Sequence, residues 1–478
     1  MPLKKSRKRG AKQAEVPAKK KRAVEKEDKD DEILESDSDE EPVSGGDGED
    51  DEDDDEVQES ATERRLRLAK SILQQVKNEE NVHHGDEDED EDDAQGLVSS
   101  DDRVATRLKN EMMEARGYRQ RQVACKVVIP SGGIAETGTT RRGHARPVTC
   151  LTLTSDDTTA YTASKDGAVF KWDVESGTKT KFCYGGDYMK YDGPNYPGSF
   201  AEPGPSSNGY AVLSCAVSSD GNFLATGGGD RVVHIYDTRS QKQIQAFPGH
   251  KDMITGLKFR DGTNQLFSVG LDRAVKMWSL DDMMYLDTLF GHQGEIMGVD
   301  CDNKERPITV SRDHTSRMWK VADETHLVFR GGGYSLDCIT LMGGGAWVTG
   351  SDNGSLQLWQ QMKKKPTMLV KGAHGESEES GLGAAAGWVQ SLAAVKGGDL
   401  LASGAGDGCI RLWGLERDST SMKELYEVPV RGFVNGLAFA RSGEFLVAGI
   451  GQEPRMGRWA RDAKARNGLF VHRIELKE

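Results

Sequence analysis

The feature of this sequence that most constrains its fold is a repeat in its C-terminal part. After Gly143, aromatic residues that each end a strand-like run follow one another at intervals of 64, 42, 41, 40, 54 and 46 residues: Trp172, Tyr236, Trp278, Trp319, Trp359, Trp413 and Trp459. Intervals of ~40–45 residues are typical of the four-stranded blade of a β-propeller. The two longest intervals contain glycine-rich insertions, at residues 183–209 and 375–387. The repeat therefore predicts an all-β propeller of seven blades.

The residues inside each repeat keep a fixed register relative to the aromatic residue. Ten positions before it, a serine or threonine recurs in the first six repeats: Thr162, Thr226, Ser268, Thr309, Thr349 and Ser403. Six positions before it, an aspartate or asparagine recurs: Asp166, Asp230, Asp272, Asp313, Asn353 and Asp407. A histidine precedes four of the repeats: His144, His250, His292 and His374. Agreement at two fixed offsets in six repeats excludes a chance pattern.

This register resembles that of the WD-repeat family, in which the histidine, the serine or threonine, the aspartate and the tryptophan of one blade form a buried hydrogen-bonded set. The resemblance implies two such sets here: His250, Ser268, Asp272 and Trp278 in one, and His292, Thr309, Asp313 and Trp319 in the other. Such a set gives each buried donor an acceptor and so locks the turn. Because a catalytic triad is a single site, a Ser–His–Asp set that recurs from blade to blade indicates structure and not a hydrolase.

No other pattern in the sequence points to catalysis, a metal or a cofactor. The Gly-Gly-Gly runs at residues 227–229 and 331–333 fall in turns between strands, so a phosphate cradle at a helix start is not expected. The seven cysteines include no C-x-x-C pair and no metal-ligand spacing, which predicts buried, reduced thiols. No apolar run approaches the length of a membrane span, and none follows the basic N-terminus as in a secretory signal. We therefore expect a soluble, intracellular, non-enzymatic protein.

Residues 1–121 differ sharply in composition from residues 122–478. They contain 23 lysines and arginines and 37 aspartates and glutamates, a net charge of −14, whereas the remainder contains 40 and 41. A segment this charged and poor in aromatic residues buries too little apolar surface to offset the entropy lost on ordering. The sequence thus predicts a mostly disordered tail at residues 1–121 and a propeller at residues 122–478.

Two basic clusters lie at the start of the tail. They consist of Lys4, Lys5, Arg7, Lys8 and Arg9, and of Lys19, Lys20, Lys21 and Arg22. Paired basic clusters fit the acidic grooves of a nuclear import receptor and also contact phosphates. They predict nuclear localisation, and the alternative is a solvated basic end that no receptor binds.

Acidic tracts follow the basic clusters. Residues 25–61 carry 21 acidic residues and two lysines, and residues 86–93 are all acidic. Like-charge blocks repel and stay open, and they either bind basic partners such as histones or ribosomal proteins or merely keep the chain soluble. Ser36 and Ser38 lie among acidic residues, so both are candidate sites for an acidophilic kinase.

Two segments of the tail have helical patterns. The first begins at a capping box, Ser60 to Glu63, and carries an apolar stripe of Leu66, Ala69, Leu73 and Val76. The second runs from about Asp101 to Arg121, with a stripe of Val104, Leu108, Met112 and Ala115. We interpret both as docking helices that fold on another surface, and the alternative is transient helix in a linker.

The seventh repeat keeps its tryptophan but loses the register, because Gly449 and Glu453 replace the expected Ser/Thr and Asp. Instead, five basic residues fall within twelve positions: Arg455, Arg458, Arg461, Lys464 and Arg466. A terminal blade departs from the pattern either because it closes the ring or because it carries a site. Two segments are candidates for the strand that completes this blade, residues 123–129 and residues 469–476.

A resemblance to a narrower family favours a functional site in the seventh repeat. The segments Thr62 to Lys70, Phe445 to Glu453, and Arg455 through Gly457-Arg458-Trp459 to Asn467 are similar to those of the U3 small nucleolar RNP-specific WD-repeat proteins. The order of basic end, acidic run, helix and propeller is also similar. The resemblance implies a nuclear and nucleolar protein that binds the box B/C element of the U3 small nucleolar RNA beside a kink-turn-binding protein. Other processome proteins are further implied partners.

The basic residues of the seventh repeat are therefore our candidates for RNA contacts, acting on phosphates and unpaired bases in pre-ribosomal RNA processing. Arg455 is a better candidate for an RNA contact than Arg458, because Arg458 adjoins Trp459 and strand alternation would turn its side chain towards protein. The rival hypothesis is a nuclear protein–protein adaptor of the histone-binding or ubiquitin-ligase type, which fits the tail and propeller but does not need this arginine cluster.

Overall fold

The computed structural model describes residues 120–130, 132–136, 138–183, 211–375, 387–416 and 420–477. The basic clusters, Ser36 and Ser38, the acidic tracts, the first expected helix and residues 101–119 of the second lie outside these residues. Arg121, at the end of the second expected helix, forms a parallel bridge with Gly398. Among the described residues, no helix is long and apolar enough to cross a membrane.

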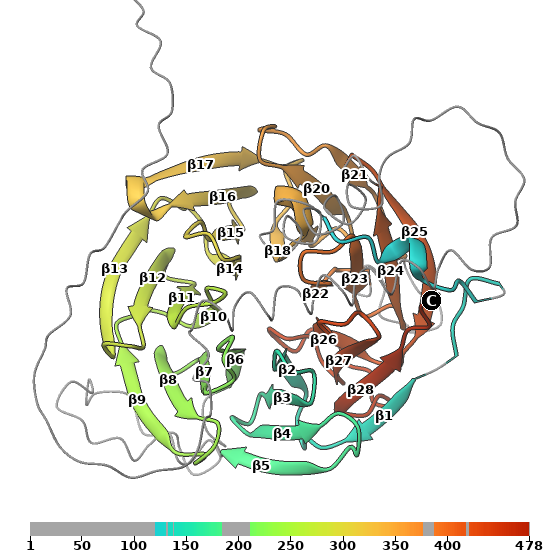
Figure 1. Cartoon of the computed structure of the whole chain (residues 1–478), viewed down its shortest axis with the longest axis horizontal. Coiled ribbons are helices and arrows are strands. Elements are labelled where there is room, and N and C mark those ends of the chain that lie inside the picture. Colours follow the sequence, from blue (N-terminus) through green and yellow to red (C-terminus); the bar gives the residue numbers. More distant parts are fainter. Residues whose placement is uncertain are drawn as a thin grey trace, which may run out of the picture. The chain divides into compact units, whose positions relative to one another are not determined.

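Seven antiparallel four-stranded sheets form the blades of a ring, as the sequence predicts (Figure 1). From the centre outward, blade one consists of β2 (Val148–Leu153), β3 (Thr159–Ser164), β4 (Val169–Asp173) and β5 (Lys179–Cys183), and blade two of β6 (Val212–Val217), β7 (Phe223–Gly228), β8 (Val232–Asp237) and β9 (Gln243–Pro248). Blade three consists of β10 (Ile254–Phe259), β11 (Gln265–Gly270), β12 (Ala274–Ser279) and β13 (Met284–Phe290), and blade four of β14 (Ile296–Asp300), β15 (Ile308–Ser311), β16 (Thr315–Lys320) and β17 (Thr325–Arg330).

The remaining blades follow the same order. Blade five consists of β18 (Leu336–Leu341), β19 (Ala346–Ser351), β20 (Leu356–Gln360) and β21 (Met368–Val370), and blade six of β22 (Ser391–Ala394), β23 (Leu400–Gly404), β24 (Cys409–Leu415) and β25 (Met422–Pro429). Blade seven consists of β26 (Phe433–Phe439), β27 (Phe445–Gly451), β28 (Gly468–Arg473) and β1 (Thr139–Arg142). Among the described residues, the short 3-10 helix η1 (Ala124–Lys126) precedes β1, and η3 (Val321–Asp323) and η4 (Gly343–Gly345) lie between strands.

The core of the propeller is a ring of apolar clusters between neighbouring blades. Ile235 of blade two and Leu266 of blade three, for example, belong to one buried cluster. Inner strands therefore bury both faces and have nearly continuous runs of apolar and small residues, as in β11, whereas the outer strand β13 is mostly exposed. This difference explains why the sequence repeat is clearest in the second and third strands of the first six blades.

The N-terminal segment of the described chain closes the ring. β1 pairs with β28, so residues 139–142 form the outer strand of blade seven. Neither expected segment takes that position: residues 469–473 belong to the third strand, and Val127 only bridges to Leu476. Before β1, the backbone N–H of Val123 donates to Asp399 Oδ1 of blade six at 2.6 Å. The first and last parts of the propeller are thereby joined, and no blade is left without a fourth strand.

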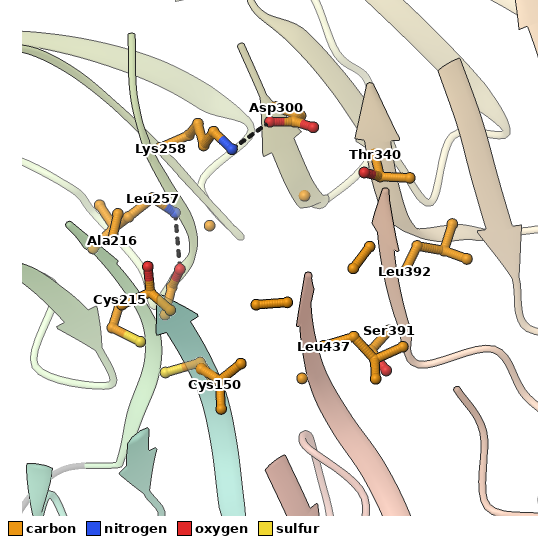
Figure 2. A pocket seen from close by; sticks show the side chains of 18 of the residues that line it. Cys150, Cys215, Ala216, Leu257, Lys258, Asp300, Thr340, Ser391, Leu392 and Leu437 are labelled. Carbon is orange, nitrogen blue, oxygen red and sulfur yellow. Dashed lines mark hydrogen bonds and ion pairs between the residues drawn. The ribbon is translucent and has the colours of Figure 1, made fainter. Parts of the chain in front are cut away.

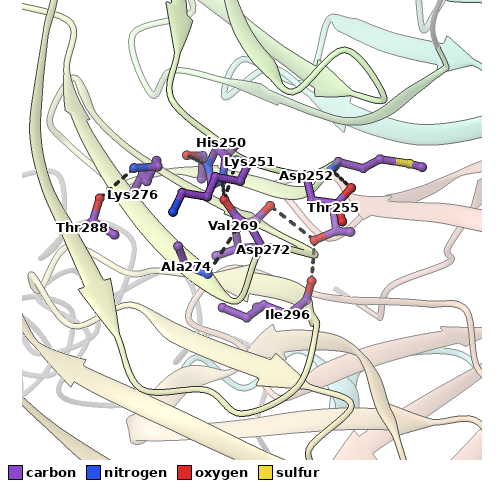
Figure 3. Close-up of polar contacts among 12 residues, drawn as sticks. His250, Lys251, Asp252, Thr255, Val269, Asp272, Ala274, Lys276, Thr288 and Ile296 are labelled. Atoms are coloured by element: carbon purple, nitrogen blue, oxygen red, sulfur yellow. Dashed lines mark hydrogen bonds and ion pairs between the residues drawn. The ribbon is translucent and has the colours of Figure 1, made fainter.

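The repeated polar residues form hydrogen-bonded chains inside the blades, and Figure 3 shows two of them, His250 and Asp272 of blade three. In blade three, Trp278 Nε1 donates to Ser268 Oγ at 2.8 Å, and Ser268 Oγ lies 2.8 Å from His250 Nε2. His250 Nδ1 then donates to Asp272 Oδ2 at 2.9 Å. The corresponding contacts in blade four join Trp319 to Thr309, Thr309 to His292, and His292 to Asp313 at 2.9, 2.7 and 2.9 Å. Each donor in the chain has an acceptor, which is the physical reason for the fixed register.

We expect Asp272→Ala to lower the free energy of unfolding by about 1–3 kcal/mol, because it leaves the buried His250 without its acceptor. Burial raises the pKa of the Asp272 carboxyl, but the hydrogen bond and charge of His250 outweigh burial and hold the pKa below its ordinary value. The carboxylate therefore stabilises the fold above pH ~4 and loses this effect as the pH falls. Urea denaturation of both proteins at pH 7 and at pH 3 measures the difference, which should shrink at pH 3. An equal difference at both pH values would contradict the role given to the carboxylate.

Candidate functional site

Blade seven has an insertion between its second and third strands. In the other blades these strands are joined by short turns, such as that from Gly270 to Ala274, whereas β27 ends at Gly451 and β28 begins at Gly468. We call residues 452–467 the blade-seven loop. All turns between second and third strands leave the same face of the ring, because every blade has the same strand order and direction. The loop therefore lies on the face that also carries the His250–Asp272 contact.

Trp459 lies in this loop and is 51% exposed, so it is not a strand residue of blade seven. The position of the blade tryptophan is taken by His472, which pairs with Leu446 as Trp278 pairs with Leu266 in blade three. The predicted number of blades is correct, but the assignment of Trp459 to a strand is wrong. The reason is the insertion, which moves the third strand to residues 468–473 and places Trp459 before it.

Hydrogen bonds between its two ends fix the blade-seven loop. The backbone N–H of Gln452 donates to Asn467 Oδ1 at 2.9 Å, and Gln452 Nε2 donates to the carbonyl oxygen of Ala465 at 2.9 Å. The Nδ2 of Asn467 donates to the carbonyl oxygen of Ala145, just before blade one, at 3.3 Å. The polar residues that distinguish this segment from an ordinary repeat thus serve first to order the loop.

The inner ends of the blades surround a central cavity of about 380 Å³ (Figure 2). The inner strands of six blades carry a β-bulge, and the bulged residues include Leu213 of β6 and Thr255 of β10. A bulged residue is left out of the strand ladder, so its carbonyl group is free to accept another donor. The Nε of Arg455 donates to the carbonyl oxygen of Leu213 at 3.2 Å, and its Nη2 donates to that of Thr255. Arg455 also lines the cavity.

This position reverses the order of preference among the candidate RNA contacts. The guanidinium of Arg455 is partly buried and is already bonded to two backbone carbonyl groups. Arg458, Arg461, Lys464 and Arg466 are instead exposed. Strand alternation does not apply to Arg458, because it lies in a loop, and its side chain is 67% exposed. The exposed residues are therefore better placed than Arg455 to contact a phosphate.

The exposed cations differ in how they are paired. Glu453 Oε2 lies 3.6 Å from Arg458 Nε and 3.3 Å from Lys165 Nζ of blade one, so Arg458 belongs to a small ionic cluster at the base of the loop. Within the described ranges, Arg461, Lys464 and Arg466 have no ion-pair partner within 4.0 Å. These three side chains are thus available to a polyanion without breaking an existing pair.

The blade-seven loop also carries an aromatic residue, Trp459, which stacks on the half-buried Trp388. The rings of Trp459 and Trp388 stack with centroids 5.2 Å apart and planes 19° apart. Trp388 is fixed in turn, because its Nε1 donates to Asp337 Oδ2 at the start of blade five. Gly457 has a positive φ of 85° and lies so close to the Trp459 ring that a Cβ there would clash. A half-exposed indole in a loop that also carries exposed cations is suited to stack on an unpaired base.

We expect Arg455→Met to lower the free energy of unfolding by about 1–3 kcal/mol, because two carbonyl groups lose their donor. The control Arg461→Met should change it by less than about 0.5 kcal/mol, since Arg461 is exposed. Chemical denaturation measures both values. If Arg455→Met is as stable as the parent but no longer binds RNA, Arg455 is a direct RNA contact after all.

Comparisons with known proteins agree with this architecture and point to a narrower family within the WD-repeat proteins. A family model described as "WD domain, G-beta repeat" matches residues 136–173, 203–237, 241–279 and 380–414. The Arabidopsis thaliana "U3 snoRNP-associated protein-like EMB2271" is 39% identical over 382 residues, which cover 79% of this chain and 78% of the relative. The human "U3 small nucleolar RNA-interacting protein 2" is 38% identical over 416 residues, or 87% and 82% of the two chains.

The chain belongs to the family of U3 snoRNP-associated WD-repeat proteins. A solved structure titled "Structure of U3-55K" is similar to this member of the family with a TM-score of 0.63 and 40% identity, and the match covers 71% of this chain and 98% of that one. Both the WD-repeat resemblance and the narrower U3 resemblance predicted from the sequence are thus confirmed.

In this U3 snoRNP-associated WD-repeat protein, sequence reasoning missed Trp388, Asp337 and Lys165, which support the blade-seven loop from blades six, five and one. The sequence carries only a weak signal for these residues. Trp388 falls outside the repeat register, directly after the second insertion, and a tryptophan outside the register is a candidate for a surface role. No group of three or more His, Cys, Asp or Glu side chains that could hold a metal is found among the described residues.

Proposed function

We propose that this protein is an RNA-binding structural subunit of the nucleolar U3 small nucleolar RNP, with a role in pre-ribosomal RNA processing and small-subunit biogenesis. The observation that carries the proposal is the ordered blade-seven loop, which presents a half-exposed tryptophan and three exposed cations that have no ion-pair partner among the described residues. Relatives named for the U3 RNP and its RNA support it. The propeller acts as a rigid support, and it binds the RNA without changing it chemically.

The proposed RNA target is the box B/C element of the U3 small nucleolar RNA, together with a kink-turn-binding protein. Arg458, Arg461, Lys464 and Arg466 would contact phosphates around the junction, and Trp459 would stack on one splayed base. A junction suits this site because its backbone is strongly charged while some of its bases are unpaired. A uniform duplex would offer phosphates but no base for Trp459.

Fluorescence anisotropy with the full chain tests this proposal. Labelled box B/C RNA bound to the kink-turn-binding protein should bind more tightly than a duplex of equal length and charge. Trp459→Ala should reduce the preference for the junction, while Ile129→Ala, an exposed apolar residue far along the sequence, should leave it unchanged. Equal affinity for junction and duplex would contradict the proposal.

We further propose that an import receptor binds the basic clusters of residues 4–22, and that the two tail helices dock on neighbouring processome proteins. Deleting residues 1–22 should shift a fluorescently tagged protein from the nucleus to the cytoplasm. A fusion of residues 1–22 to a cytoplasmic reporter is the matched control and should enter the nucleus. Nuclear accumulation of the deletion variant, in cells where no bound partner carries it in, would exclude these clusters as the signal.

A further inference from the structure

Two cysteines face each other at the central cavity. Cys150 lies on β2 and Cys215 on β6, the inner strands of blades one and two, and both line the cavity. Figure 2 shows their sulfur atoms pointing towards one another. The two residues are 9% and 7% exposed. Thr149 Oγ1 donates to the carbonyl oxygen of Val212 at 2.5 Å, which holds the two strands together beside the thiols.

The surroundings of the pair favour a reactive thiolate on Cys150. Burial raises the pKa of its thiol, but a hydrogen bond from the Cys215 thiol, the charge of Arg455 and the Thr149 hydroxyl together bring the pKa below its ordinary value. Hydrogen bonding to Cys150, and then burial, raise the pKa of the Cys215 thiol. One thiol of the pair is therefore set up as a nucleophile, and the other retains its proton and can resolve the product.

A third cysteine shows that a position at the cavity does not by itself lower the pKa of a thiol. Cys338 lies on β18 of blade five and also lines the cavity. Its thiol donates to the carbonyl oxygen of Val389 at 3.5 Å, and no other cysteine accompanies it there in the described part of the chain. Burial and the nearby Asp337 carboxylate raise the pKa of this thiol well above its ordinary value. Cys338 is thus a matched, unreactive reference for Cys150.

We propose that Cys150 and Cys215 form a modification site that a small hydroperoxide, such as hydrogen peroxide, converts into a disulfide bond between blades one and two. The Cys150 sulfur attacks one peroxide oxygen, so that an S–O bond forms, the O–O bond breaks, and the departing hydroxide takes the thiol proton to become water. The Cys215 sulfur then attacks the sulfenic acid sulfur. The S–S bond forms, the S–O bond breaks, and hydroxide leaves with the Cys215 proton as a second water. Two thiols are oxidised, and one peroxide is reduced to two waters.

Mass spectrometry of the reduced full chain treated with hydrogen peroxide tests this assignment. A cross-linked pair of peptides containing Cys150 and Cys215 should form first, with the loss of two hydrogen atoms, while Cys338 stays reduced. In Cys215→Ser, the resolving thiol is gone, so dimedone should trap a sulfenic acid on Cys150. In Cys150→Ser, Cys215 should remain reduced. Cys338→Ser should form the Cys150–Cys215 cross-link at the parental rate.

The exposed Cys125 provides an internal reference within the same sample. Oxidation of Cys150 more slowly than Cys125, or a cross-link that joins other cysteines, would overturn the proposal. Circular dichroism of each variant before treatment shows whether it is folded. If Cys150→Ser is unfolded, dimedone trapping in Cys215→Ser decides the question. A Cys215→Ser protein that forms no dimedone adduct on Cys150 would also overturn the proposal.

Discussion

Replacing Arg461, Lys464 and Arg466 together with glutamine is expected to weaken binding to box B/C RNA by roughly 100-fold at 0.1 M salt. The three side chains are exposed and have no ion-pair partner among the described residues, so the variant removes positive charge without leaving a carboxylate unpaired. Each lost phosphate contact should also lower the slope of log affinity against log salt by about one, or about three in total. A salt titration by fluorescence anisotropy measures both quantities in one experiment.

The chain offers a matched control for this variant. Lys363, Lys364 and Lys365 are also three exposed cations, and they lie between β20 and β21. This connection joins third and fourth strands and therefore leaves the opposite face of the ring from the blade-seven loop. Replacing these lysines with glutamine should change affinity and salt slope far less. Equal losses in both variants would mean that the RNA responds to net charge and not to the blade-seven loop.

Trp278→Ala is expected to lower the free energy of unfolding by about 3–5 kcal/mol, whereas Trp459→Ala should lower it by about 1 kcal/mol or less. Trp278 is 2% exposed, stacks on Phe247 with ring centroids 5.0 Å apart, and donates to Ser268. Trp459 is 51% exposed, although the sequence repeat gives the two residues equivalent positions. Urea denaturation followed by circular dichroism measures both variants.

The comparison between the two tryptophans distinguishes a blade residue from a surface residue. Trp459→Ala should also weaken RNA binding while the protein stays folded, and Trp278→Ala should affect RNA only to the extent that the fold is lost. Similar destabilisation in both variants would mean that Trp459 supports blade seven in solution, and its role as a stacking surface would have to be given up.

The blades could be predicted from the sequence because the fixed spacing of their polar and aromatic residues has a local physical cause. Ser268, Asp272 and Trp278 keep fixed offsets because they lie on one hairpin, where Ser268 and Asp272 bond to His250 and Trp278 bonds to Ser268. Blade seven has no such chain, so its strands are not marked by the repeat. The repeat therefore predicts the third strand at Trp459, whereas this strand lies at residues 468–473.

Long-range contacts explain what the sequence did not reveal. The outer strand of blade seven comes from residues 139–142, more than 300 positions from its partner, and no local pattern marks it. Arg455 has the same basic character as Arg461 in the sequence. Only the packed ring shows that bulges in β6 and β10 offer it two carbonyl groups, while Arg461 is left exposed. Two arginines of one segment thus differ in burial and bonding only because of tertiary contacts.

Immunoprecipitation of the tagged full chain from cells, followed by sequencing of the bound RNA, tests the central claim most directly. We predict that one RNA, the U3 small nucleolar RNA, dominates the bound fraction, and that the Arg461, Lys464 and Arg466 triple variant loses it while the Lys363, Lys364 and Lys365 variant retains it. A bound fraction without this RNA, in which histones or ubiquitin-ligase subunits are recovered instead, would contradict the account and identify the protein as an adaptor.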